Sequence, residues 1–357
     1  EIAAVHNGRI LQRISVADAS AFYRDYLTKH PASNEVRIAY SRLLIGSNQI
    51  DPAREQLQWL FDKNPEDAEI MLAVGLLATE MGDFDTTETS FKKALSLGYK
   101  DANAIHFHLG QIYEETNRSD LAMETYQMVR SGSRYLPAQI RYADLLALKG
   151  QLTEARAHLQ KLPAANDQQA AHLILAEAQI LRRSRAHQEV FNLLNDGLKK
   201  LPDYPELLYD RALAADKLGK FNILEQDLRK LIKLKPDNAH AYNALGYSYA
   251  ERGAHLPEAL KLIKKAVELS PEDPYIMDSL GWVYYRMGNI AEGLNYLNLA
   301  FSARPDPEIA AHLGEVLWVQ GAKDDARNIW RSALDKDPAN EVLLETLQRL
   351  TKKKVID

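Results

Sequence analysis

The chain has 357 residues, of which 46% are hydrophobic and 26% are charged, the balance of an ordinary globular protein rather than a disordered one. Its 44 lysines and arginines against 49 aspartates and glutamates give a net charge of −5, so the charge balance does not point to nucleic acid or an anionic membrane surface as a partner. The chain contains no cysteine, which excludes disulfides, thiolate zinc sites and a cysteine nucleophile.

From its start, the chain predicts one helix pair after another. Residues 1–13 and then Val16 to Pro31 predict a first pair with a weak pattern. Nine stretches of similar length follow, and each predicts two helices joined by a turn that often holds glycine. We place them at 34–67, 68–101, 103–135, 136–170, 171–204, 205–238, 239–273, 274–306 and 307–340. A last helix over Glu341 to Lys354 alternates apolar and charged residues, as a helix that shields the end of an array does.

Two of these stretches have nearly the same sequence. From Tyr242 the chain reads YNALGYSY, and 35 residues later it reads MDSLGWVY. Each copy pairs a glycine in its first helix with a small residue in its second, Gly246 with Ala259 and Gly281 with Gly293. Small side chains at both places let two helices approach closely, so we expect these pairs to mark contacts between helices. Other glycines predict left-handed caps at the ends of first helices: Gly82, Gly150, Gly219, Gly288 and Gly321.

The spacing matches W-x2-L-G-x2-Y, then A-x3-F, then a closing proline. The chain therefore resembles the tetratricopeptide repeat family, whose unit is a helix-turn-helix of 34 residues. The resemblance implies an all-α fold, a right-handed α-solenoid superhelix of about nine stacked units with a C-terminal capping helix. The expected parts are a degenerate N-terminal helix pair, two halves of the repeat array, and the capping helix with its tail, at 1–33, 34–204, 205–340 and 341–357.

No constellation of catalytic side chains stands out along the chain. The phosphate-binding, nucleophile-elbow, dinucleotide and zinc-protease motifs do not occur in the sequence. His106 and His108 are two residues apart, so on a helix they face different directions and do not form a metal site. We therefore expect no enzyme activity, cofactor or metal in this chain. The alternative is that it is the recognition arm of a longer enzyme whose catalytic domain lies outside these residues.

The resemblance also implies where a partner binds. In this family the first helix of each unit lines the concave surface, and a fixed set of its positions points inward. Carried onto this sequence, these positions predict a groove rich in aromatic side chains, at Tyr209, Tyr247, Tyr275, Asp278, Trp282, Tyr285, Arg286, Glu315 and Trp318. Aromatic and arginine side chains are common anchors of protein interfaces, so the expected partner is an extended peptide or a helix of another protein. The alternative is that these aromatic rings pack between adjacent first helices.

The phrases AYNALGYSYAERG and DSLGWVYYRMGN are also similar to those of repeat lipoproteins from the Gram-negative envelope. One such type resembles an adaptor that delivers substrates to a carboxy-terminal processing protease in the periplasm. This resemblance implies a non-catalytic adaptor on the periplasmic side, with hydrolysis performed by the partner. The chain begins at Glu1 without methionine, and no apolar run is long enough to span a bilayer, so we expect a targeting signal with a lipid anchor to be missing from its start.

Overall fold

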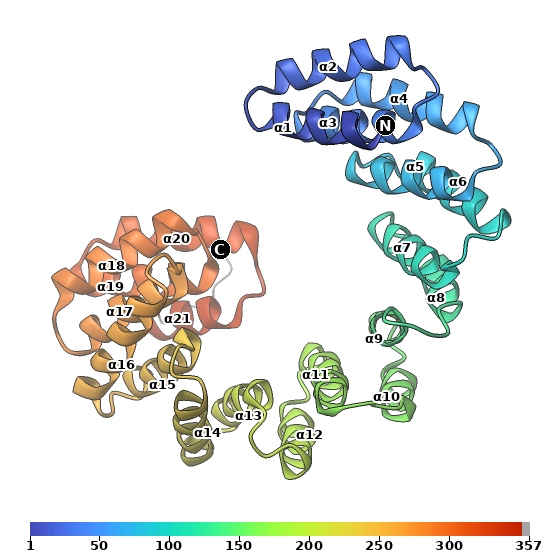
Figure 1. Cartoon of the computed structure of the whole chain (residues 1–357). Helices are drawn as coiled ribbons and strands as arrows, with labels where there is room; N and C mark the ends of the chain where they lie inside the picture. The colour runs from blue at the N-terminus through green and yellow to red at the C-terminus, as the bar shows by residue number, and fades with distance from the viewer. Residues whose placement is uncertain (352–357) are drawn as a thin grey trace. The chain divides into compact units, whose positions relative to one another are not determined.

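The structure consists of α-helices in two compact parts. It is a computed structural model that describes residues 1–351, and all the elements in that range are helices. Contacts divide the chain into unit 1, Glu1–Pro163, and unit 2, Ala164–Asp357, which Figure 1 draws in blue to green and in yellow-green to red. The tail of the predicted capping segment, residues 352–357, lies outside the described residues.

Successive helices pair as the sequence predicts, with an odd-numbered first helix and an even-numbered second helix in every repeat. Unit 1 holds α1 (Ile2–Gln12), α2 (Val16–Lys29), α3 (Asn34–Gly46), α4 (Ile50–Lys63), α5 (Ala68–Glu80), α6 (Phe84–Ser96), α7 (Ala102–Glu115), α8 (Ser119–Gln127), α9 (Tyr135–Leu148) and α10 (Leu152–Lys161). Unit 2 holds α11 (Asp167–Arg183), α12 (His187–Lys200), α13 (Pro205–Lys217), α14 (Phe221–Leu234), α15 (Ala239–Glu251), α16 (Leu256–Leu269), α17 (Pro274–Arg286), α18 (Ile290–Ala303), α19 (Pro307–Gln320), α20 (Lys323–Lys336) and α21 (Glu341–Thr351). These are the predicted repeats, the N-terminal pair and the closing helix, so the all-α solenoid is confirmed.

The helices begin and end where polar caps and glycines allow. At the start of α17 the Asp273 carboxylate accepts hydrogen bonds from the backbone N–H groups of Tyr275 and Ile276. The glycines predicted to end first helices all have positive φ values, from 67° at Gly219 to 94° at Gly321. A residue without a Cβ atom adopts this conformation at little cost, so the predicted caps are confirmed.

Within a repeat the two helices touch through small residues. A Cβ atom built on Gly281 would lie 2.9 Å from the carbonyl oxygen of Gly293 and 2.9 Å from the backbone nitrogen of Leu297. Both neighbours are backbone atoms of α18, so neither can move unless the helix moves. A Cβ atom on Gly246 would lie 3.0 Å from the carbonyl oxygen of Ala259. Both predicted contacts between small residues are therefore confirmed.

Adjacent repeats are joined by buried apolar side chains and by ion pairs. In unit 1 one hydrophobic core extends from α4 to α9, and in unit 2 another extends from α11 to α19. Such continuity is expected, because a single helix pair cannot bury its apolar face alone. Ion pairs also cross from one repeat to the next, as between Arg118 and Glu88 at 2.6 Å and between Arg229 and Glu258 at 2.8 Å.

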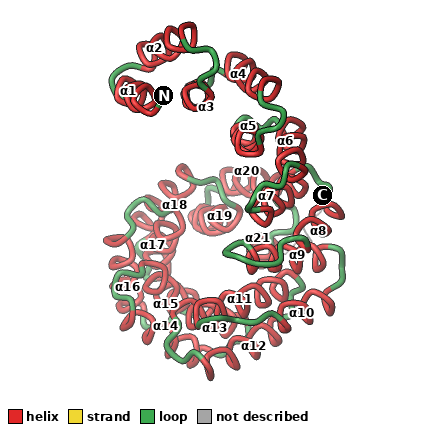
Figure 2. The backbone as a smooth tube through the Cα atoms, turned by 45° about the vertical axis from the view of Figure 1, so that its right-hand side comes forward, coloured by secondary structure: helices red, strands yellow, loops and turns green. Residues whose placement is uncertain are grey.

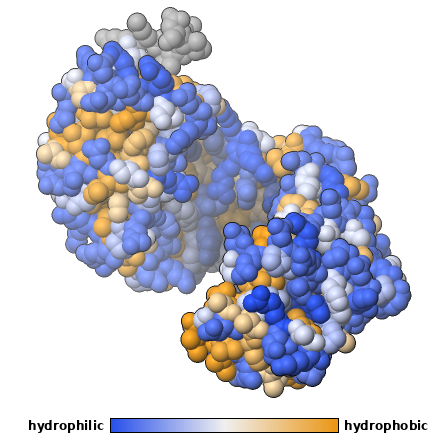
Figure 3. Space-filling model, turned by 90° about the horizontal axis from the view of Figure 1, so that it is seen from above, coloured by the Kyte–Doolittle hydropathy of each residue, from blue (hydrophilic) through white to orange (hydrophobic). Residues whose placement is uncertain are grey.

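The surface is mostly polar. Figure 3 shows hydrophilic residues over most of the visible face, with separate hydrophobic areas between them. Scattered apolar side chains are normal on a folded protein. Among the helices of residues 1–351, none is both long and apolar enough to cross a membrane.

Replacing Gly281 with alanine is expected to destabilise unit 2, because the new methyl group pushes α17 away from the backbone of α18. Overpacking of this kind costs about 1–3 kcal/mol, measured as a lower free energy of unfolding in urea. Gly46 at the end of α3 is the matched control, because nothing lies within 4 Å of a Cβ atom built there. Gly46→Ala is expected to be neutral or slightly stabilising. Equal losses in the two variants would contradict the close contact.

Candidate functional site

The first helices of unit 2 lie along one face of the array. Figure 2 shows α11, α13, α15 and α19 on the inner side of this unit, and α12, α14, α16 and α20 on its outer side. The closing helix α21 packs against α19, the first helix of the last repeat. It therefore continues the row of first helices.

A pocket of about 580 Å³ is formed where the C-terminal ends of α15 and α17 meet α19 and α21, and we call it the inner pocket. Most of its lining side chains are aromatic or charged. The lining residues are Glu251, Trp282, Tyr285, Arg286, Gly288, Ile290, Glu315 and Arg349. The structure thus brings together four residues predicted from the sequence, Trp282, Tyr285, Arg286 and Glu315.

Trp282 forms a wall of the inner pocket and exposes only 3% of its surface. Its indole N–H donates a hydrogen bond of 2.8 Å to the Glu251 carboxylate, and its ring stacks on His312 with 4.3 Å between the ring centroids. Each contact reaches a neighbouring first helix, α15 in one case and α19 in the other. The burial of Trp282 favours the alternative stated above, that its ring packs between adjacent first helices.

Glu315 is a buried carboxylate that the closing helix neutralises. Its side chain is 6% exposed, whereas the side chain of its partner Arg349 is 57% exposed. The Arg349 guanidinium donates to both carboxylate oxygens, and one of these bonds measures 2.9 Å. The Tyr285 hydroxyl donates a longer bond of 3.5 Å to the same carboxylate. Removing one member of a buried ion pair leaves an uncompensated charge, so Glu315 depends on Arg349 in this form of the pocket.

Arg286 ties α17 to the end of α15. Its guanidinium donates a bond of 2.6 Å to the backbone carbonyl oxygen of Glu251, and it lies 5.7 Å from the centre of the Trp282 ring. A guanidinium over an indole face is a favourable cation–π contact. The inner pocket therefore contains two arginines and two glutamates, arranged on four successive first-helix positions of the array.

Beside the inner pocket, His312 sits in a buried chain of hydrogen bonds. Its Nδ1 lies 2.8 Å from the Asp278 carboxylate, and its Nε2 lies 3.2 Å from the Tyr247 hydroxyl oxygen. Burial lowers the pKa of His312, but the Asp278 carboxylate, helped by the two glutamates of the inner pocket, outweighs burial and raises the pKa above its ordinary value. Burial and nearby carboxylates also raise the pKa of Tyr247, which stays a neutral phenol. The His312 ring thus joins Asp278 on one side to Tyr247 on the other.

Three predicted residues lie away from the inner pocket. Tyr209 lines a separate pocket of about 370 Å³ formed by α11, α13 and α15. Tyr275 lies at the start of α17, where its hydroxyl donates a bond of 3.0 Å to Asp306. The ring of Trp318 packs against Trp330 of its own second helix, with 5.6 Å between centroids. These three residues therefore do not line the inner pocket.

The predicted set omits three side chains that shape the site, Glu251, Arg349 and His312. Arg349 lies 34 residues after Glu315, so the repeat register, extended into the closing helix, could have found it. His312 gives no such signal, because its place in α19 is not among the inward positions that the family resemblance assigns. Only the packing of α17 on α19 reveals it.

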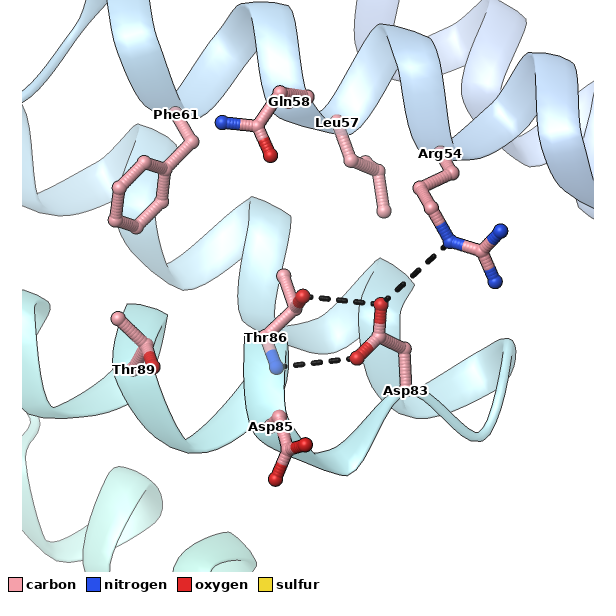
Figure 4. A pocket seen from close by; sticks show the side chains of 8 residues that line it. All are labelled: Arg54, Leu57, Gln58, Phe61, Asp83, Asp85, Thr86 and Thr89. Atoms are coloured by element: carbon pink, nitrogen blue, oxygen red, sulfur yellow. Dashed lines mark hydrogen bonds and ion pairs between the residues drawn. The ribbon is translucent and has the colours of Figure 1, made fainter.

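Unit 1 has a smaller pocket of about 230 Å³ between α4 and α6. Figure 4 shows Arg54 beside Asp83, whose carboxylate accepts hydrogen bonds from the backbone N–H and the hydroxyl of Thr86. Asp83 is the N-cap of α6, so its polar contacts serve the start of that helix. Within residues 1–351, histidine, aspartate and glutamate side chains form no group of three or more that could hold a metal. The inner pocket is therefore our candidate site.

Trp282→Ala is expected to lower the free energy of unfolding by about 3–5 kcal/mol, because it leaves a cavity between first helices. Tyr285→Ala is the comparison. Tyr285 is only half-buried, so its replacement should lower the free energy of unfolding much less. Urea denaturation of the two variants measures the difference. A Trp282→Ala protein as stable as the wild type would contradict the packing role of this ring.

The pair of Asp278 and His312 is expected to make stability depend on pH. Because the pKa of His312 is raised on folding, the pair stabilises the protein below about pH 6.5, and this stabilisation is lost as the pH rises through the folded pKa. The difference in unfolding free energy between wild type and His312→Gln should therefore shrink as the pH is raised above neutral. His106 in α7 is the control of opposite sign, because burial lowers its pKa. The difference in unfolding free energy between wild type and His106→Gln should therefore grow from acid to neutral pH. The same pH trend at both histidines would contradict the opposite pKa shifts assigned to them.

Several known proteins are similar to this chain. A TPR repeat-containing protein of Pseudomonas aeruginosa is 38% identical over 249 residues, which are 70% of this chain and 42% of that protein. The cellulose synthase operon protein C of Pseudomonas fluorescens is 24% identical over 307 residues, which are 78% of this chain and 23% of that protein. The matched part thus spans less than half the length of either relative. Among solved structures, a tetratricopeptide repeat protein from Parabacteroides merdae is 18% identical, covers 80% of this chain and 99% of that one, and superposes with a TM-score of 0.49.

The family comparison agrees with the repeats seen in the helices. The tetratricopeptide repeat profile matches residues 75–137, 209–274 and 279–341, which together make up more than half of the chain. Matches therefore fall in both units and include the first helices that build the inner pocket. The chain belongs to the tetratricopeptide repeat family.

Proposed function

We propose that the chain is a non-catalytic adaptor that binds a partner protein or peptide on the inner face of unit 2, around the inner pocket. Tetratricopeptide repeats form protein–protein interaction scaffolds, and proteins built from them are generally non-catalytic. The observation that carries the proposal is the inner pocket, where aromatic and arginine side chains surround a space of about 580 Å³. Side chains of these types are enriched where proteins bind one another.

Tyr285 and Arg286 are the side chains of this pocket best placed to touch a partner. Both are half-buried, so part of each meets solvent. The buried ring of Trp282 supports them, with 5.1 Å between its centroid and that of Tyr285 and with Arg286 over its face. Because this support restricts both side chains before a partner arrives, binding removes little further freedom from them.

The resemblance to envelope lipoproteins favours one setting for such an adaptor. We place it on the periplasmic side of a Gram-negative envelope, where it delivers substrates to a carboxy-terminal processing protease. The repeat phrases quoted above support this setting. In a reconstituted digestion, a purified protease of this class should cleave its substrate faster when the chain is present. An unchanged cleavage rate would contradict delivery to the protease, but it would not contradict binding of a partner at the inner pocket.

A photo-crosslinking amino acid placed at residue 285 is expected to capture the partner in a native extract. The same amino acid at residue 284 is the control, because the Tyr284 ring faces away toward α18, stacked on Tyr296 at 5.8 Å. Equal capture from both positions would contradict binding at the inner pocket.

With the captured partner purified, Tyr285→Ala combined with Arg286→Ala is expected to weaken binding by about 2–4 kcal/mol, the range of interface hot spots. Calorimetry measures the affinity, and circular dichroism verifies that the variant keeps its helices. Tyr284→Ala combined with Lys264→Ala removes another aromatic–cation pair, with Lys264 Nζ 5.7 Å from the ring, and should bind as the wild type does. Unchanged affinity in the first double variant would place the partner elsewhere.

A further inference from the structure

The carboxylates near the inner pocket are fixed in its wall, whereas the arginine that pairs with one of them comes from the solvent side. The side chains of Glu315 and Asp278 are 6% and 8% exposed, but that of Arg349 is 57% exposed. Glu315 cannot leave its place without disturbing α19. Arg349, on a long flexible side chain at the end of α21, can turn into solvent. Glu315 is therefore a permanent acceptor with an exchangeable donor.

The geometry of this acceptor suits a guanidinium group. Arg349 meets Glu315 with two parallel N–H donors, one to each carboxylate oxygen, which is the bidentate arrangement that arginine makes and lysine does not. The aromatic rings of Tyr285 and Trp282 line the same pocket and favour a flat cation next to them. Arg349 thus shows, within the chain itself, which chemical group the pocket accepts.

The surrounding charge also favours a cation. Three carboxylates, those of Asp278, Glu251 and Glu315, act together on the buried imidazole of His312. Once Arg349 has turned away, these three carboxylates outnumber Arg286, the one arginine left in the pocket, so a basic segment would be attracted and an acidic one repelled.

We propose that Glu315 is the recognition site for an arginine side chain of the partner, and that Arg349 of the closing helix occupies this site until the partner arrives. This inference rests on the proposed function and specifies the partner's chemistry, a segment that presents an arginine. Arg349 acts as an internal substitute for the partner's arginine, so binding exchanges one guanidinium for another. Glu315 keeps its counter-ion throughout.

The closing helix remains in place during this exchange. Leu343 and Leu347 of α21 are buried in a cluster with Ala310 and Trp330 of the last repeat. These apolar contacts hold α21 independently of Arg349. The exchange therefore needs only a side-chain movement and no unfolding of the helix.

The full chain is tested with three labelled pentapeptides that differ only at the central residue, which is arginine, lysine or the uncharged isostere citrulline. Fluorescence polarisation measures Kd. Arg349→Ala, which empties the site, should bind the arginine peptide roughly tenfold or more tightly than the wild type, the effect of one charge-assisted contact. It should prefer arginine to lysine and to citrulline. Glu315→Gln should bind the three peptides equally and weakly.

Arg349→Ala also leaves a buried carboxylate unpaired, so its thermal melting is recorded with added methylguanidinium. This small cation should raise the melting temperature of Arg349→Ala but not that of the wild type. Arg349→Met, which keeps the apolar stem of the side chain, serves as the second variant. The inference is overturned if neither Arg349 variant prefers the arginine peptide, or if methylguanidinium does not raise the melting temperature of Arg349→Ala. The ion pair would then serve only to hold the closing helix.

Failure of this inference is distinguishable from failure of the adaptor proposal. If residue 285 captures a partner but no variant prefers the arginine peptide, the adaptor proposal is supported and the recognition of arginine by Glu315 is contradicted. If the arginine peptide binds through Glu315 but residue 285 captures no protein, the pocket binds guanidinium groups. The proposal that a partner protein binds there is then contradicted.

Discussion

The close contact between the two helices of a repeat is the constraint on which the rest of the structure depends. Where Gly281 faces Gly293, the backbones of α17 and α18 approach so closely that a Cβ atom does not fit between them. This contact sets the geometry of one repeat, and repetition then places the first helices side by side. Side chains from successive repeats can therefore meet, which is how Trp282 reaches Glu251 on α15 and His312 on α19.

One consequence is that the inner pocket and the stack of repeats share the same atoms. The pair of Glu315 and Arg349 joins α19 to α21, and the bond from Arg286 to Glu251 joins α17 to α15. Each of these contacts holds neighbouring first helices together and also shapes the pocket. A partner that binds there adds to such contacts or replaces them, so its binding free energy is coupled to the spacing of the repeats.

The sequence predicts the architecture well because the architecture depends on patterns within single repeats. The cap at Gly321 and the close contact at Gly281 each need only a few nearby residues. The candidate site is predicted less completely, because the repeat register identifies inward positions but not how deeply a side chain is buried. Trp282 is buried and its neighbour Tyr285 is half exposed, since His312 of the next first helix stacks on the former. No pattern within a repeat contains that contact.

The rigidity of the pocket wall determines how selective the site can be. The buried chain from Asp278 through His312 to Tyr247 links α17, α19 and α15, so the wall exists before any partner binds. A preformed site loses little freedom on binding, and it discriminates by the penalty it imposes on the wrong group. An apolar partner would bury the part-exposed charges of Arg286 and Arg349 without replacing their contacts with water, which is costly. Selection at the inner pocket therefore depends on matching its polar groups, and the area buried is secondary.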